Sequence, residues 1–308
     1  MGGGTDVDAA YIWMIERAGG GDFLILRATG NGAYDDYIYD LGQQTSQPVN
    51  SVSTLVLKTR AASFDSFVIE MTQNCSALYF AGGDQWTYYS FWKSSPLQKA
   101  IIKSPHYAAR PTGGTSAGNA IQPEFVYNAE FGSADSVTSL RDPYNEYITI
   151  GTSFLANQVL TNTITDTHFY QRNRMGRLVA FISRLATDSW AGMPNAPNSG
   201  CSDPLYGARA IGVDEATALL IDENNSVSIT SWDVDGSAYL LCLDHLPTSC
   251  APKTHLDVAD IQTIKLSGNG TDLFNLHSWS VINTNVVQYT LTASNGVLDS
   301  SQSGGDIY

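Results

Sequence analysis

Short apolar runs recur along the first third of the chain, and segments of helical length separate them. Residues 22–27, 53–57 and 77–81 are the clearest of these runs. Runs that are apolar throughout, rather than at every second residue, are typical of strands buried on both faces of a parallel sheet. Their alternation with helical segments predicts a doubly wound α/β fold with a mainly parallel sheet.

The sequence pattern changes from about Gly236 onward. Short segments such as residues 238–243 and 286–291 are separated by Gly, Asn and Ser, which is typical of antiparallel strands. No Pro/Ser-rich linker precedes them. We therefore expect an α/β domain over residues 1–235 and a β-rich C-terminal extension, residues 236–308, packed on it. Its last residues, from Ser300, are expected to be frayed.

Composition and charge limit the partners that the chain can bind. Its 308 residues, of which 43% are hydrophobic, are enough to form a large core. With 16 basic and 30 acidic residues the formal net charge is −14, which repels the phosphates of nucleic acids and anionic lipids. No run approaches the roughly 18 apolar residues of a membrane-spanning helix. We therefore expect neither a nucleic acid nor a membrane as a partner.

Cysteines and sequons bear on metal binding and on location. The cysteines form no Cys-X-X-Cys pair and have no histidine at zinc-ligand spacing, so no structural metal is expected. Cys242 and Cys250 enclose a short loop and are a candidate disulfide. Sequons at Asn74, Asn224 and Asn269, together with a small number of lysines, favour an extracellular location.

The segment from Gly114 to Gly118 has the form Gly-X-Ser-X-Gly, with Ser116 at its centre. Such a turn lets the serine hydroxyl project, and its small neighbours leave the adjoining amides free to bind an oxyanion. Residues 117–128 can open a helix whose positive end faces the same turn. Ser116 is therefore a candidate nucleophile, and an ordinary glycine-rich loop is the alternative interpretation.

Residues 166–178 contain a histidine and three arginines, although the chain is otherwise poor in basic groups. His168 can act as a general base toward a serine, and arginines bind a carboxylate by paired hydrogen bonds. The alternative is a solvated helix start that is capped by Asp166, with its arginines paired to surface acids.

Two further segments carry polar groups next to apolar runs. Asp214 and Glu215 lie between apolar residues, so at least one of them needs a partner where water is scarce, and a histidine is a suitable one. An exposed strand end is the alternative. Gly82-Gly83-Asp84-Gln85 follows the third apolar run, where open α/β sheets bind substrates, and its spacing does not fit a dinucleotide-binding or phosphate-binding loop.

Taken in order, the segments GGDQ, GGTSAG, DTHFYQRNRMGRL and GVDEATAL resemble the signature blocks of the cyanophycinase family of serine peptidases, which also contains aspartyl dipeptidases. The resemblance covers roughly residues 2–223. It implies a flavodoxin-like fold related to class I glutamine amidotransferases. It also implies cleavage of cyanophycin to β-Asp-Arg dipeptides, or of a related aspartyl or isopeptide bond, without a metal or organic cofactor. The implied partner is a peptide or cyanophycin-like substrate, and a homodimer is implied by the resemblance only.

The same resemblance assigns roles to individual residues. It makes Ser116 the nucleophile, His168 the general base and Glu215 the acid that orients the histidine, with Asp214 as the alternative for this last role. The other matching positions are the oxyanion-hole amides of Gly83 and Ala117 and the substrate-pocket residues Gln85, Asp166, Arg172, Arg174 and Arg177.

The chain departs from the family pattern at three places. Thr167 and Ala216 stand where cyanophycinases typically have Gln and Asn, so we expect the triad to persist while the substrate preference differs. Family members usually have an apolar strand before the glycine-rich turn that begins here at Gly2. This predicts a truncated first strand, and with it the loss of any signal peptide.

Two other classes of function fit parts of the sequence. An esterase of the α/β-hydrolase class shares the Gly-X-Ser-X-Gly turn but places its acid before its histidine, which would require His245, His255 or His277 in place of His168. A non-catalytic binding protein on the same scaffold is the second alternative, and the changes at Thr167 and Ala216 motivate it.

Overall fold

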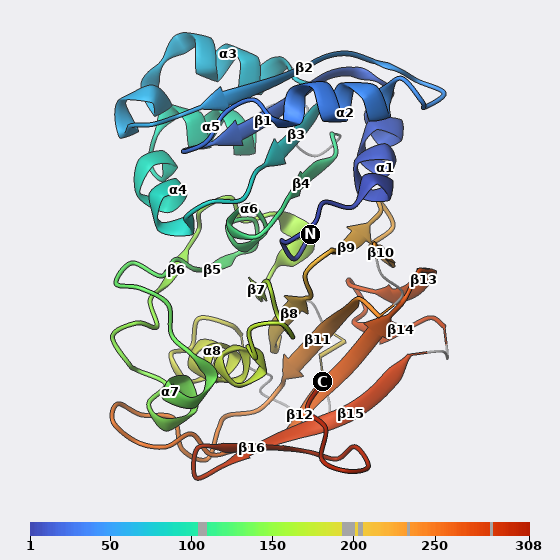
Figure 1. Ribbon diagram of the computed structural model, residues 1–308. Coiled ribbons are helices and arrows are strands. Elements are labelled where there is room, and N and C mark those ends of the chain that lie inside the picture. Colours follow the sequence, from blue (N-terminus) through green and yellow to red (C-terminus); the bar gives the residue numbers. More distant parts are fainter. Residues whose placement is uncertain (104–109, 193–200, 203–205, 233–234, 284–285) are drawn as a thin grey trace.

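The computed structural model describes residues 1–308 except 104–109, 193–200, 203–205, 233–234 and 284–285 (Figure 1). Its first sheet has the order β2 (Val49–Val56), β1 (Gly21–Arg27), β3 (Ala77–Phe80) and β4 (Thr112–Gly114), and all neighbouring strands are parallel. The first three strands contain the apolar runs from which a parallel sheet was expected, so this part of the fold is confirmed.

Helices cover both faces of this sheet because successive strand residues point to opposite sides. Phe23, Ile25 and Tyr79 pack with helices α1 (Asp8–Ala18) and α2 (Tyr34–Gly42). The alternate residues of β1 and β3 pack on the other face, where the elements are η1 (Arg60–Phe64), α3 (Ser66–Asn74), α4 (Gln85–Trp92) and α5 (Pro96–Lys103). The first part of the chain is therefore doubly wound.

Local sequence signals fix several helix boundaries. Asp65 begins α3 by accepting a hydrogen bond from the Phe67 amide, and Asp84 begins α4 by accepting one from the Thr87 amide. Helix α1 ends at Ala18, and the next residue, Gly19, caps it in a left-handed conformation with φ of 69°. The turn into α4 thus places residues 82–85 at the carboxyl end of β3.

The second sheet contains eight strands and combines parallel and antiparallel pairs. Its order is β16 (Val297–Ser300), β15 (Val287–Ser294), β12 (Val258–Ser267), β11 (Ser237–Leu243), β8 (Ala208–Val213), β7 (Thr163–Asp166), β5 (Phe125–Tyr127) and β6 (Ile150–Thr152). Strands β5, β7 and β8 are parallel, and the remaining pairs are antiparallel. The C-terminal strands thus continue the sheet that carries β7 and β8.

Smaller elements complete the fold. A third, antiparallel sheet has the order β14 (Ser280–Val281), β13 (Gly270–Asn275), β10 (Ser226–Ser231) and β9 (Thr217–Ile221). The remaining helices are α6 (Ala117–Ala120), α7 (Ser136–Arg141), η2 (Gln158–Leu160) and α8 (Met175–Thr187). Helix α8 is buried along most of its length against the second sheet. No helix in the described residues is long and apolar enough to cross a membrane.

Three local expectations were wrong. The helix after Ser116 does not continue to residue 128, because α6 ends at Ala120 and β5 follows it. Cys242 forms its disulfide with Cys201, across a Cα–Cα distance of 6.2 Å, while Cys250 is free. The chain end is not frayed, because the ring of Tyr308 packs against Tyr239 on β11 and against Phe169, which follows β7.

Candidate active site

Ser116 lies in a tight turn between β4 and α6. Its φ of 51° and ψ of −119° lie outside the regions that non-glycine residues usually occupy, and such strain is common at catalytic residues. The turn also needs glycine at position 118, where a Cβ atom would lie only 2.0 Å from the carbonyl oxygen of Phe80. Packing against β3 therefore holds the serine in its strained conformation.

His168 follows β7 and faces Ser116. Its Nε2 atom lies 2.8 Å from Ser116 Oγ, and its Nδ1 atom lies 2.5 Å from Glu215 Oε1. A carboxylate only accepts hydrogen bonds, so Nδ1 carries the proton and Nε2 is left to accept from the serine hydroxyl. The structure thus brings Ser116, His168 and Glu215 into one hydrogen-bonded chain.

Asp214, the alternative acid, is turned away from His168. One carboxylate oxygen accepts from the Tyr170 amide at 2.8 Å, and the other accepts from the Ser237 amide at 3.2 Å. Burial raises the pKa of Asp214 to about 6, although these two amides oppose the shift. Of the two neighbouring acids, only Glu215 is therefore placed to orient the imidazole.

The glycine-rich turn at residues 2–4 passes directly beside these side chains, which the sequence interpretation did not foresee. A Cβ atom on Gly3 would lie 2.4 Å from His168 Cε1, and one on Gly4 would lie 3.0 Å from Glu215 Cβ. Both glycines have positive φ angles. The sequence signal for this turn is the run of three consecutive glycines, but their spacing does not match a known ligand-binding motif.

The same turn joins the two large sheets. The Met1 carbonyl accepts from the Ser116 amide at 3.3 Å, and the Gly2 carbonyl accepts from the His168 amide at 2.8 Å. The Gly3 carbonyl accepts from the Ala216 amide at 2.8 Å. The nucleophile and the base belong to different sheets, and this short backbone segment bonds to both.

The environment of His168 favours its neutral form. Burial lowers the pKa of His168, the nearby Arg172 and Arg174 lower it further, and the Glu215 carboxylate opposes the shift. A histidine must be neutral at Nε2 to accept a proton from a serine hydroxyl. The local charges therefore favour the form that a general base requires.

Gly83 and Ala117 lie on the two turns that flank the serine. A Cβ atom on Gly82 would lie 3.6 Å from Ser116 Cβ, so the turn after β3 is adjacent to the nucleophile. Among the turn, loop and cap hydrogen bonds of the described residues, neither the Gly83 nor the Ala117 amide donates to a backbone acceptor. Both amides are thus available to an oxygen atom at Ser116.

The expected substrate-pocket residues differ in how far they are exposed. Asp166 and Arg177 are buried, and the guanidinium bonds the carboxylate at 2.5 and 2.6 Å. Arg174 lies 3.4 Å from the same carboxylate and donates to the Thr167 carbonyl at 2.6 Å. Arg172 is exposed and its Nε lies 3.9 Å from Glu215 Oε1. Arg172 is thus the arginine of this set with the most open access to a ligand near the histidine.

Gln85 is the remaining member of that set, and it is the first residue of α4, partly exposed at the end of the turn beside Ser116.

The other candidate histidines have partners elsewhere. His245 lies 3.1 Å from both an Asp244 carboxylate oxygen and the Ala259 carbonyl oxygen, and His255 lies 2.8 Å from Asn295 Oδ1. His277 is exposed beyond β13. In the described residues only His168 contacts Ser116, and these residues contain no cluster of His, Cys, Asp and Glu suited to a metal ion.

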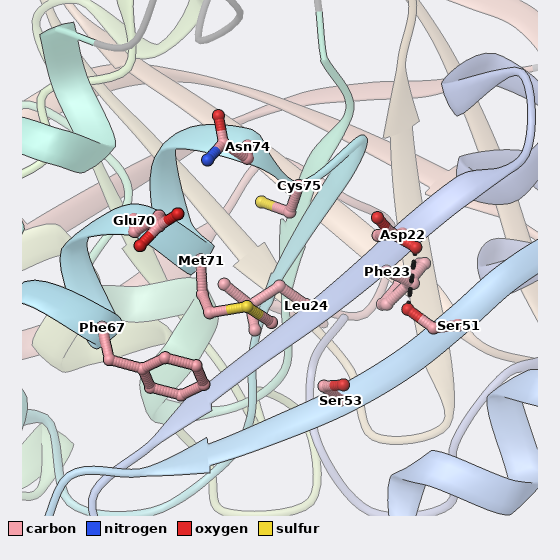
Figure 2. A pocket seen from close by; sticks show the side chains of 10 residues that line it. All are labelled: Asp22, Phe23, Leu24, Ser51, Ser53, Phe67, Glu70, Met71, Asn74 and Cys75. Carbon is pink, nitrogen blue, oxygen red and sulfur yellow. Dashed lines mark hydrogen bonds between the residues drawn. The ribbon is translucent and has the colours of Figure 1, made fainter.

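A pocket of about 180 Å³ lies elsewhere, between α3 and the strands β1 and β2 (Figure 2). Asp22 and Cys75 line it near the amino ends of β1 and β3, whereas Ser116 follows the carboxyl end of β4. Its other lining residues are Phe23, Leu24, Ser51, Ser53, Phe67, Glu70, Met71 and Asn74. None of the three hydrogen-bonded residues described above contributes to it.

Comparisons with known proteins agree with the resemblance seen in the sequence. No protein-family model matches the chain. A cyanophycinase from Synechococcus elongatus is 27% identical over 225 residues, covering 73% of this chain and 57% of that protein. A cyanophycinase from Geminocystis herdmanii is 24% identical over 191 residues, covering 61% of this chain and 59% of that protein. The chain thus spans little more than half the length of these curated relatives.

A solved structure supports the fold. The crystal structure of a peptidase from an acI-B1 Actinobacterium superposes with a TM-score of 0.51 at 17% sequence identity, and the match covers 88% of this chain and 93% of the other. The two chains therefore share the mixed α/β architecture.

Proposed function

We propose that the chain, which is similar to cyanophycinases, is a serine peptidase that cleaves an aspartyl or isopeptide bond through Ser116, His168 and Glu215. One observation carries the proposal. Ser116 Oγ, the two ring nitrogens of His168 and Glu215 Oε1 form a continuous chain with separations of 2.8 and 2.5 Å. This is the order and geometry in which a carboxylate orients an imidazole that takes a proton from a serine.

The chemistry follows from these contacts. Nε2 of His168 takes the hydroxyl proton as Ser116 Oγ attacks the substrate carbonyl carbon, and the amides of Gly83 and Ala117 bind the resulting oxyanion. Collapse of this intermediate breaks the bond to nitrogen, and the imidazolium gives its proton to the leaving amine. Water then attacks the acyl-enzyme by the same route, with His168 again as base. Glu215 remains ionised and stabilises the imidazolium.

The charges around the triad favour a substrate with both signs of charge. The exposed Arg172 can bind a carboxylate near the scissile bond, while the net charge of −14 attracts cationic groups over longer distances. In cyanophycin, arginines are joined through their α-amino groups to the β-carboxyls of a polyaspartate backbone. Each arginine therefore carries a free α-carboxylate and a cationic guanidinium, which fits both requirements. Thr167 and Ala216 differ from the residues typical of cyanophycinases, and a related Asp-containing peptide is the second candidate substrate.

Labelling with a fluorophosphonate probe tests the proposed nucleophile. The wild-type protein should be labelled once, and Ser116→Ala should not be labelled. Ser94→Ala is the matched control because Ser94 also has a positive φ, of 58°, but lies in the turn between α4 and α5. Cleavage of cyanophycin to β-Asp-Arg is then compared among the three proteins. Labelling or cleavage by Ser116→Ala at the wild-type rate would reject the assignment.

The same experiment addresses the non-catalytic alternative. A binding protein on this scaffold would neither react with the probe nor release dipeptides, although it would still retain a cyanophycin-like ligand. Lack of labelling in the wild-type protein, together with measurable ligand binding, would therefore replace the peptidase proposal by that alternative.

A further inference from the structure

The turn that carries His168 is supported by residues from the far end of the chain. His168 has a φ of 49°, in the left-handed region that non-glycine residues rarely adopt. Such a conformation persists only where the surroundings hold it. The segment from residue 168 to the start of α8 therefore needs contacts beyond its own backbone.

Part of this support comes from β8 and the residue that follows it. The Phe169 amide donates to the Val213 carbonyl at 3.3 Å, and the Phe169 ring lies where a side chain on Gly212 would be, 2.6 Å from the Cβ position. Asp214 then bonds the Tyr170 amide with one oxygen and the Ser237 amide of β11 with the other. These contacts fix the first two residues after His168.

Tyr308 supplies the rest of the support. Its hydroxyl accepts a hydrogen bond from the Met175 amide at 3.1 Å and donates one to Asn173 Oδ1 at 2.9 Å. Met175 is the first residue of α8, so its amide has no acceptor within the helix. The hydroxyl thus joins the end of the turn to the beginning of the helix.

The Tyr308 ring covers the same turn. Its centroid lies 5.9 Å from that of Phe169 and 5.1 Å from that of Tyr170, with both pairs edge to face. A third edge-to-face pair, at 5.7 Å, joins it to Tyr239 on β11. Such pairs contribute on the order of 1 kcal/mol each beyond the burial of their surface. The backbone and side chains of the residues that follow His168 are therefore held against the second sheet and the ring of Tyr308.

We propose that Tyr308 is a positioning residue, which keeps the His168 imidazole aligned between Ser116 and Glu215 by holding residues 169–175. The expected effect on kcat rests on the proposed peptidase function. The expected effect on the position of the imidazole does not. None of the contacts that Tyr308 makes with the described residues involves the three triad side chains. Tyr308 thus acts on the reaction through the turn.

Two substitutions separate the ring from the hydroxyl. Tyr308→Ala removes both, and we expect kcat per labelled active site to fall by roughly tenfold to a hundredfold, because an imidazole displaced by a fraction of an ångström loses its alignment with the serine. Tyr308→Phe keeps the ring and should lose less. KM should stay unchanged in both. Tyr39→Ala, on the exposed side of α2, is the control and should retain the wild-type kcat.

A merely structural role would give a different result. Counting active sites with the fluorophosphonate corrects kcat for any misfolded fraction, so a loss of stability alone would leave kcat per site at the wild-type value. That outcome in Tyr308→Ala would overturn the proposal. A raised KM with unchanged kcat would also overturn it, because it would assign Tyr308 to substrate binding.

A second measurement does not depend on peptidase activity. The proton on His168 Nδ1 should give a low-field ¹H NMR resonance, since it is hydrogen-bonded to the Glu215 carboxylate. We expect this resonance in wild type and Tyr39→Ala, and its broadening or loss in Tyr308→Ala. If the wild-type protein hydrolyses nothing, the proposed function fails, yet this resonance still decides the positioning role. Its persistence in Tyr308→Ala would refute that role.

Discussion

Substitution of Gly3 by alanine tests whether the glycine-rich turn must pass this close to the base. The new Cβ would lie 2.4 Å from His168 Cε1 and 2.6 Å from Nε2, the atom that faces Ser116. Ordinary van der Waals contact begins about 1 Å farther out. Since the turn is fixed by hydrogen bonds from His168 and Ala216, we expect the imidazole to move.

The size of the effect can be estimated from this displacement. A shift of about 1 Å in a reacting group costs on the order of 10²-fold in rate, which corresponds to about 2.7 kcal/mol in activation free energy. The backbone adds a separate cost, because φ at Gly3 is +94° and a left-handed L-residue is destabilised by roughly 1–2 kcal/mol. The first cost concerns catalysis and the second concerns stability.

A matched variant separates the two costs. Gly19→Ala has a similar backbone penalty, with φ of +69°, but its Cβ would meet only the flexible end of Gln47 at 3.1 Å. We expect both variants to lose comparable unfolding free energy in a denaturant titration. Only Gly3→Ala should be labelled about 10²-fold more slowly by a fluorophosphonate. A Gly3→Ala labelling rate within about threefold of that of Gly19→Ala would refute the steric argument.

Three further predictions concern charged groups. Arg172→Ala should raise the pKa of His168, so the acidic limb of the labelling rate moves to higher pH; a limb that stays in place would contradict the assigned charge effect. The pKa of Asp214 is raised to about 6, so its contribution to stability is complete below the usual value of 3.8 and is lost as pH rises through 6. Denaturant titrations from pH 4 to 7 should show this loss relative to Asp214→Asn, and parallel curves would contradict it. Asp166→Asn leaves Arg177 buried without its anion and should lower the unfolding free energy by about 3–5 kcal/mol, whereas a loss below about 1 kcal/mol would indicate a relaxed site.

The parts of the molecule that sequence could predict are those encoded over short distances. Continuous apolar runs at β1 and β3 identified a parallel sheet because burial on both faces demands them. The turn at Ser116 was recognisable because its glycines are required by one local conformation. The roles of Ser116, His168 and Glu215 were inferred from short sequence motifs that resemble those of the family, each only a few residues long.

The features that were missed depend on contacts between distant segments. Cys201 bonds Cys242 across 41 residues, and no spacing rule distinguishes this pair from the nearby Cys250. Tyr308 reaches a turn more than a hundred residues away, so its role was invisible in a segment that looked polar and irregular. The assignment of Glu215 rather than Asp214 was not missed, but it came from the resemblance, because the two acids are adjacent and chemically alike and only the direction of each side chain separates their partners.

The division of the triad between two sheets affects how the protein would lose activity. Ser116 depends on β3 and β4 and His168 on β7, and residues 1–3 form backbone hydrogen bonds to both turns. A small separation of the sheets would break the 2.8 Å contact while each sheet kept its own hydrogen bonds. Inactivation by heat or denaturant should therefore precede the loss of ellipticity. Catalytic activity would then measure how closely the two sheets are held together, rather than the folding of either sheet.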